Sequence, residues 1–171
     1  MADALASKLA RRFAVEVKPS GAEDTAWVRV KGINSLTPNL EQNFEDSTDF
    51  DNDGWTSSEK TSQGWSLALG LIEKVGQTDR IQDPGQRILE QTQDKFGGEG
   101  FVDVRWGERE GDVAYTGNAA VQWEPQGGGV TDLSSVNVTL TGNGKRLPLS
   151  PNPFDTGDSG DGENAGGGSG E

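Results

Sequence analysis

Alternation of apolar and polar residues recurs along most of the chain between residues 13 and 150. The clearest run is 65–71, in which Trp65, Leu67, Leu69 and Leu71 alternate with small or polar residues. A period of two places every second side chain on one face of a strand, so this run predicts a strand with one buried face. Similar alternation predicts further strands over 13–18, 27–33, 102–106, 115–123, 136–141 and 145–149.

One helix is expected among these strands, over residues 83–96. Asp83 is a good N-cap, Pro84 occupies the first helical position, and Gly97 and Gly98 follow the last turn. The residues expected on its apolar face are Ile88, Leu89, Thr92 and Phe96. Alternating strands separated by glycine-rich turns are typical of an antiparallel sandwich or barrel. We therefore predict a mainly β fold, an antiparallel β-sandwich or barrel with one flanking α-helix.

A long polar stretch between two of the predicted strands, residues 39–61, is interpreted as an acidic loop. It carries seven acids against one lysine, a net charge of -6, yet it also contains Phe44, Phe50 and Trp55. Loops of this length in compact domains are usually functional or disordered. Bulky aromatic residues in a polar loop are typical anchors for a partner surface, so these three are predicted contact residues. The alternative is that they fold back and fasten the loop to its own domain.

The two ends of the chain differ from the predicted domain of residues 13–154. Residues 1–12 predict a short helical arm, with Leu5 and Leu9 one turn apart, or else a frayed terminus. Residues 155–171 contain seven glycines, five acids and no large apolar side chain. Such a segment cannot bury enough surface to order itself, so it is predicted to be a flexible acidic tail.

Composition excludes several kinds of chemistry. The 171 residues include no cysteine and no histidine, which removes thiol chemistry, Ser-His nucleophiles and the commonest metal ligand. No apolar run is long enough to cross a membrane, and the first residues do not form a secretory signal, so the chain is expected to be made and kept in the cytoplasm. The net charge of -13 disfavours tight binding of phosphates. We predict no cofactor and no enzymatic activity.

One metal-binding alternative stays open at this point. Asp49, Asp51, Asp53 and Gly54 match the start of an EF-hand calcium loop. The twelfth position of that motif needs a bidentate Glu, but here it is Lys60, and the flanking segments are predicted strands. A solvated acidic loop is therefore the favoured interpretation. A monomeric β-sandwich binding module with a calcium-binding loop is the main alternative for the whole chain.

The order of these segments resembles the major tail tube proteins of long-tailed (siphovirus-type) bacteriophages, most of all those of actinobacterial phages. The resemblance covers about residues 13–150. It rests on four segments in this order: Trp27–Ile33, the acidic Asp49–Trp55, Thr61–Leu71 with Trp65 at its centre, and Val136–Arg146.

The resemblance implies a structural virion protein of the phage tail, assembled in the host cytoplasm. Six copies would form a ring whose sheets join into a barrel, and stacked rings would form the tube through which DNA passes without specific binding. The long loop would reach the adjacent ring. Expected partners are other copies of the chain and other tail proteins, such as the tape measure, tail tip and terminator proteins. A capsid decoration protein is a third possibility.

A barrel of this kind exposes alternate residues of each strand to its channel. The candidates for the channel wall are Ser66, Asp103, Asn137 and Thr139. A net negative wall without a stripe of Lys or Arg would repel phosphates and let DNA slide.

Overall fold

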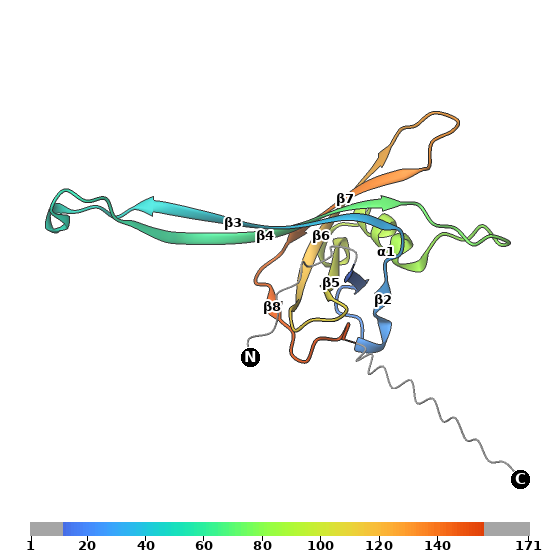
Figure 1. Ribbon diagram of the computed structural model, residues 1–171, viewed down its shortest axis with the longest axis horizontal. Coiled ribbons are helices and arrows are strands. Elements are labelled where there is room, and N and C mark those ends of the chain that lie inside the picture. The colour runs from blue at the N-terminus through green and yellow to red at the C-terminus, as the bar shows by residue number, and fades with distance from the viewer. Residues whose placement is uncertain (1–11, 156–171) are drawn as a thin grey trace, which may run out of the picture.

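The computed structural model describes residues 12–155, so the predictions for the N-terminal arm and the acidic tail fall almost wholly outside the described part. Within it the fold is mainly β, with one α-helix (Figure 1). The strands are β1 Phe13–Pro19, β2 Val28–Arg29, β3 Ile33–Asp46, β4 Ser58–Ile72, β5 Phe101–Glu108, β6 Ala114–Gln126, β7 Ser135–Gly142 and β8 Leu147–Pro148. The helix α1 is Pro84–Gln93, and short 3-10 turns cover Asp24–Ala26, Phe50–Asn52 and Gly97–Gly100.

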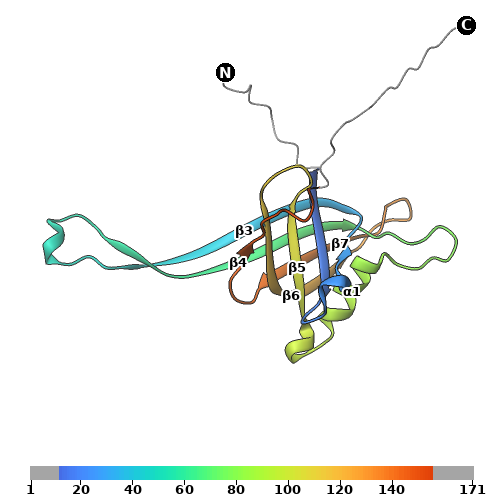
Figure 2. The same ribbon diagram turned by 90° about the horizontal axis from the view of Figure 1, so that it is seen from below.

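All the strands belong to one antiparallel sheet that folds over on itself at β6. The order is β2-β1-β5-β6-β7-β4-β3, with β8 also on β6. The first half of β6, up to Ala120, pairs with β5, whereas its second half, from Ala119, pairs with β7. Figure 2 shows β1, β5 and β6 crossing β3 and β4 steeply. The predicted sandwich with one helix is therefore confirmed, and its two layers are continuous through β6.

The core lies between the two layers and is built by the alternation that the sequence shows. Leu67 and Leu71 of β4 and Leu140 of β7 are completely buried, and burying such a side chain stabilises the fold by about 1.5–3 kcal/mol. Val15, Val17, Val102 and Val104 face them from the other layer. The indoles of Trp65 and Trp106 stack across the core with ring centroids 5.1 Å apart.

The helix begins as predicted but ends earlier. The Asp83 carboxylate accepts hydrogen bonds from the backbone N–H groups of Gly85 (3.1 Å) and Gln86 (3.2 Å). Leu89 is fully buried, but the prediction that Phe96 shares its face is wrong, because the ring is 94% exposed. The chain leaves the helix at Asp94 and is extended by Phe96 (φ -115°), so this side chain no longer follows the helical period.

Two predictions about the segment between 27 and 61 are corrected. The strand expected over 27–33 is reduced to Val28–Arg29, because the chain turns at Gly32 with φ +81° before β3 begins. The loop expected over 39–61 is mostly strand: β3 and β4 pair from Ile33↔Leu71 out to Asp46↔Ser58. Alternation failed to indicate this pairing because both faces of the outer hairpin are exposed and polar.

Candidate assembly surfaces

The outer part of the β3–β4 hairpin, residues 41–63, projects from the body of the molecule, and we call it the arm (Figure 1). Every residue of β3 after Leu36 is exposed, and so is every residue of β4 before Trp65. An isolated two-stranded hairpin is at best marginally stable in water. The arm therefore depends on the buried inner half of the same hairpin to keep its position.

The end of the arm, residues 46–57, is an ordered turn that we call the tip. The Asp49 carboxylate accepts a hydrogen bond from the backbone N–H of Asp51 at 3.0 Å. Asp53 and Gly54 both adopt positive φ, at 49° and 82°, which reverses the chain. The Ser47 N–H bonds the Ser57 carbonyl at 3.0 Å and closes the turn. The tip thus has a defined shape.

The three predicted contact residues lie on the arm and are exposed. Phe50 and Trp55 sit on the tip with relative exposures of 106% and 80%, and Phe44 lies on β3 with 55%. The alternative that these aromatic rings fasten a loop to its own domain is therefore wrong for this chain. Large apolar side chains gathered at the end of a projecting hairpin are typical of an interaction site. Their role as contacts stays a prediction.

Two of the four carboxylates of the tip, those of Asp46 and Asp49, are engaged in the turn. Asp46 accepts hydrogen bonds from the hydroxyl and the backbone N–H of Thr48, in that order of importance, and these bonds lower the pKa of Asp46 below its ordinary value. Asp49 caps the 3-10 turn. Within residues 12–155, no group of three or more acidic side chains is placed to hold a metal ion. The calcium-loop alternative thus finds no assembled ligand set there.

Three of the four predicted channel residues share one face of the sheet. Ser66 pairs with Thr141, while Asn137 and Thr139 of β7 pair with Gly70 and Ala68 of β4. Directly paired residues point to the same side, so these side chains lie on the face opposite the core. Extending the pairing to β3 and β6 gives three rows of four, which we call the polar rows: Asn39-Ser66-Thr141-Ala120, Thr37-Ala68-Thr139-Gln122 and Ser35-Gly70-Asn137-Glu124. Glu124 is their single charged residue, and they contain no Lys or Arg.

The fourth candidate, Asp103, lies in the other layer. It pairs with Lys18 of β1, and its carboxylate accepts hydrogen bonds from the amide of Asn118 (2.8 Å) and the N–H of Gly21 (3.2 Å). Beside it, Arg105 donates to Glu16 at 2.6 Å. This surface is built of ion pairs, and the structure therefore does not bring Asp103 together with the polar rows.

The layer that carries the polar rows has an open edge on each side. In the part of the chain that the structure describes, β3 pairs only with β4, and β6 beyond Ala120 pairs only with β7. Pro38 in β3 agrees with an edge position, because proline is confined to edge strands within sheets. Unpaired backbone groups along an edge are a template for pairing with another chain. This layer can therefore be extended in both directions.

A buried glutamine that the sequence analysis missed fixes the base of the hairpin. The Gln86 side chain is completely buried. Its amide donates to the carbonyls of Lys31 (2.7 Å) and Ile72 (2.9 Å) and accepts from the N–H of Lys74 (3.1 Å). It thus ties the segments that enter β3 and leave β4 to the start of α1. The spacing of Asp83 and Gln86, an N-cap followed three residues later by Gln, is the signal that could have indicated this residue.

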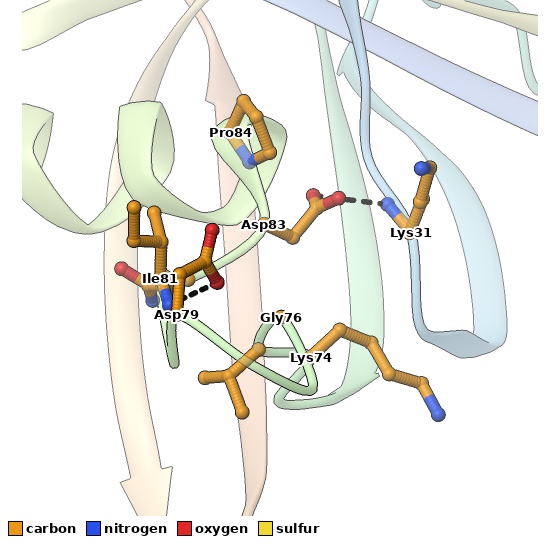
Figure 3. A pocket seen from close by; sticks show the side chains of 9 residues that line it. Lys31, Lys74, Gly76, Asp79, Ile81, Asp83 and Pro84 are labelled. Carbon is orange, nitrogen blue, oxygen red and sulfur yellow. Dashed lines mark hydrogen bonds between the residues drawn. The ribbon is translucent and has the colours of Figure 1, made fainter.

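A pocket of about 340 Å³ lies near the start of α1 (Figure 3). The two acidic residues that line this pocket, Asp79 and Asp83, have structural roles. Asp83 caps α1 and also accepts from the Lys31 N–H at 3.3 Å, and Asp79 accepts from the Ile81 N–H at 3.0 Å. The Lys74 side chain extends away from both carboxylates. The pocket therefore offers no free pair of acids for catalysis. Among the described residues, no helix is long and apolar enough to span a membrane.

Comparisons with known proteins find similarity at the level of structure. No family model matches the sequence, and no curated protein matches it significantly. A chain from the tail of an empty gene transfer agent particle, refined with C6 symmetry, has a TM-score of 0.63 and 10% identity, covering 84% of this chain and 100% of that one. A chain of the SPP1 tail tube has a TM-score of 0.63 and 14% identity, covering 82% and 77%. The chain has the fold of these tail proteins.

A third similar structure extends the comparison to a different kind of particle. A chain in the baseplate of the anti-feeding prophage has a TM-score of 0.57 and 12% identity, covering 87% of this chain and 97% of that one. Because all three identities are low, the likeness is one of fold. It agrees with the fold implied by the resemblance to tail tube proteins.

Proposed function

We propose that this chain is a structural subunit of a phage-type tail tube, located in the tail of a virion and without catalytic activity. Six copies join side by side into a ring, and rings stack into a hollow tube through which DNA passes. Other tail proteins, such as tape measure, tail tip and terminator proteins, would meet the tube at its core and ends. The three similar structures come from a tail, a tail tube and a baseplate, which supports this role.

The observation that carries the proposal is the layer β3-β4-β7-β6 with an open edge on each side. Pairing the β3 edge of one copy with the β6 edge of the next would extend the sheet from subunit to subunit. Such an interface is heterologous, and it forms a closed ring when the rotation per subunit divides a full turn. Closure removes the exposed edges. The C6 symmetry of one similar tail agrees with six subunits.

The test of the proposal is assembly by the purified full-length chain. We expect concentrated protein, imaged by negative-stain electron microscopy, to show six-membered rings and hollow tubes. A monomer that stays monomeric at high concentration and shows neither rings nor tubes would contradict the proposal. A calcium-dependent monomer would instead favour the binding-module alternative, and closed assemblies without tubes would favour a decoration protein.

The polar rows are proposed to line the channel, with Ser66, Asn137 and Thr139 among the wall residues. Asp103 is left out of this proposal because its carboxylate is bonded within the ion-pair surface of the other layer. A wall of hydroxyl, amide and small side chains with Glu124 as its charge gives a phosphate backbone no cation to bind. DNA would then slide without being retained.

Retention of DNA tests the channel assignment. Tubes of the unaltered chain should leave DNA in the supernatant after sedimentation. Tubes with Asn137→Lys and Thr139→Lys should retain DNA at low salt and release it at high salt, because the attraction is screened within about 10 Å at 0.1 M salt. Tubes with Lys at two exposed helix positions, Gln91→Lys and Gln93→Lys, add the same charge and are the control. A resolved tube with a basic lumen would overturn the assignment. The likeness to tail tubes of actinobacterial phages stays a prediction.

A further inference from the structure

A groove of about 410 Å³ lies at the root of the arm, where the loop after β7 meets the β3–β4 hairpin. Leu40 and Trp65 supply its apolar part, and Lys145 and Arg146 supply its charge. No acidic residue lines it. We call it the basic groove. Its chemistry suits a ligand that combines apolar groups with negative charge.

The groove is held in shape by its own contacts. The Trp65 indole N–H donates to the Gly144 carbonyl at 3.0 Å, and Trp65 as a whole is only 5% exposed. Gly142 lies so close to this indole that a Cβ atom there would collide with it. The Arg146 guanidinium stacks on the Tyr115 ring at 4.4 Å from its centroid. A site that is already formed loses little entropy when it binds a partner.

The tip of the arm has the complementary chemistry. Residues 46–57 include four aspartates, no Lys and no Arg, and they carry the exposed rings of Phe50 and Trp55. The turn itself is ordered by the bonds of Asp46 and Asp49 described above. Both partners are thus preorganised, one acidic and aromatic, the other basic and apolar.

The tip of one chain is too far from its own groove to enter it. Leu40 pairs with Trp65 at the groove, and the paired strands continue to Asp46 and Ser58 before the tip begins. Six residues of strand at about 3.4 Å each separate Leu40 from Asp46, which is roughly 20 Å. A paired antiparallel ladder does not bend back over that distance. A tip that fills the groove must come from another copy.

We propose that the basic groove is the receptor for the tip of a second copy of this chain, with Lys145 and Arg146 facing the aspartates and the apolar floor facing Phe50 and Trp55. The inference rests on the proposed tube function and names the surface that the arm reaches. Because the tip and the basic groove lie on different parts of the same chain, the contact between two copies is heterologous. Repeated without closure, it generates an open-ended filament, as a stack of rings requires.

Cross-linking between introduced cysteines tests the pairing, because the natural chain contains no cysteine. A variant with Asp51→Cys and Lys145→Cys is assembled, treated with a short bismaleimide, and run on a denaturing gel. We expect a ladder of dimers, trimers and longer species, since each chain would be linked at its tip and at its groove. Asp51→Cys alone should give no species beyond a dimer. Asp51→Cys with Lys95→Cys, an exposed lysine just after the end of α1, should give no ladder.

The outcomes separate this inference from the proposed function. Tubes without the ladder would overturn the groove as receptor while leaving the tube function intact. Protein that forms neither rings nor tubes, with or without cysteines, would overturn the proposed function and this inference with it.

Charge exchange gives a second measurement. Lys145→Glu together with Arg146→Glu should leave ring formation unchanged and raise the concentration needed for tubes at least about tenfold, because like charges would then face each other. Asp46 and Asp49 are kept in all variants because they order the turn. Asp51→Lys with Asp53→Asn lowers the charge of the tip from -4 to -1 and should also weaken stacking. Combining both sets of changes should recover part of the stacking lost with the groove changes alone, because the tip then repels the two introduced glutamates less. Failure of the combined variant to recover, when each set alone blocks stacking, would count against the pairing.

Discussion

The inner and outer halves of the β3–β4 hairpin have the same antiparallel pairing but opposite surroundings. In the inner half, Trp65, Leu67, Leu69 and Leu71 are buried in the core. In the outer half, beyond Leu40, both strands are exposed on both faces, and Phe50 and Trp55 stand at the tip. Backbone pairing alone therefore does not distinguish a part that builds the fold from a part that is available to a partner. Burial does.

The difference also assigns separate roles to aromatic residues of the same hairpin. Trp65 is stacked, hydrogen-bonded and 5% exposed, so most of its contribution is to the stability of the monomer. Trp55 is 80% exposed, so the contribution of its side chain should appear mainly on assembly. Changes in the inner half should thus lower the free energy of unfolding, and changes in the outer half should affect tube formation alone. The following predictions test this separation.

The largest effect is expected for Trp65→Ala. Removing the buried indole leaves a cavity beneath Trp106 and frees the Gly144 carbonyl, so the free energy of unfolding should fall by about 3–5 kcal/mol. Urea denaturation of the monomer, followed by fluorescence of the other tryptophans, measures this. Trp65→Phe keeps a ring but loses the hydrogen bond, and should cost less. A change below about 1 kcal/mol for Trp65→Ala would show that this residue is not a core anchor.

A smaller loss is expected for Gln86→Met, which keeps the side-chain volume but removes three hydrogen bonds at the base of the hairpin. The Lys31 and Ile72 carbonyls and the Lys74 N–H would lose their buried partner, which should cost roughly 1–3 kcal/mol. The same denaturation experiment measures it. Gln91→Met, on the exposed side of α1, is the matched control and should change stability by less than about 0.5 kcal/mol. An equal change in the free energy of unfolding for the two variants would contradict the role of Gln86 in holding the base of the hairpin.

The sequence predicts the inner half well and the outer half poorly, for a physical reason. Val102, Val104, Val136 and Val138 alternate because one face of each strand is buried, so pattern and structure agree. The arm has no buried face, so its residues carry no alternation, and the sequence pattern predicts a loop where the strands are paired. The acidic and aromatic composition of 39–61 still predicts contact with a partner, and this stays a prediction. The alternation within each strand predicts which of its residues face away from the core, as in the polar rows. It does not predict that Asp103 lies in the other layer, because that depends on how the sheet folds over at β6.

The tip should behave in the opposite way to Trp65. Trp55→Ala should leave the free energy of unfolding of the monomer within about 0.5 kcal/mol of the natural chain, because the ring is 80% exposed. Stacking of rings should weaken by about 2 kcal/mol per contact, the scale of a hot-spot aromatic residue. The concentration at which tubes appear, followed by light scattering, measures this. Normal assembly by this variant, or an unfolded monomer, would show that the tip has another role.

The smallest effect is expected for Phe44→Ala, which tests where along the arm the contact begins. Phe44 lies on β3 opposite Lys60, just past an irregularity in the pairing, and is 55% exposed, so part of its surface is already covered by the arm itself. Less of it remains for a neighbour to bury than at Phe50 or Trp55. We expect a loss of stacking below about 1 kcal/mol, smaller than that of Trp55→Ala, and no measurable change in the monomer. Light scattering of the two variants side by side at equal concentration and salt gives the ranking. A larger loss of stacking free energy for Phe44→Ala than for Trp55→Ala would show that the main contact lies on the paired strands of the arm and not on its tip. That result would count against the tip as the element that enters the basic groove.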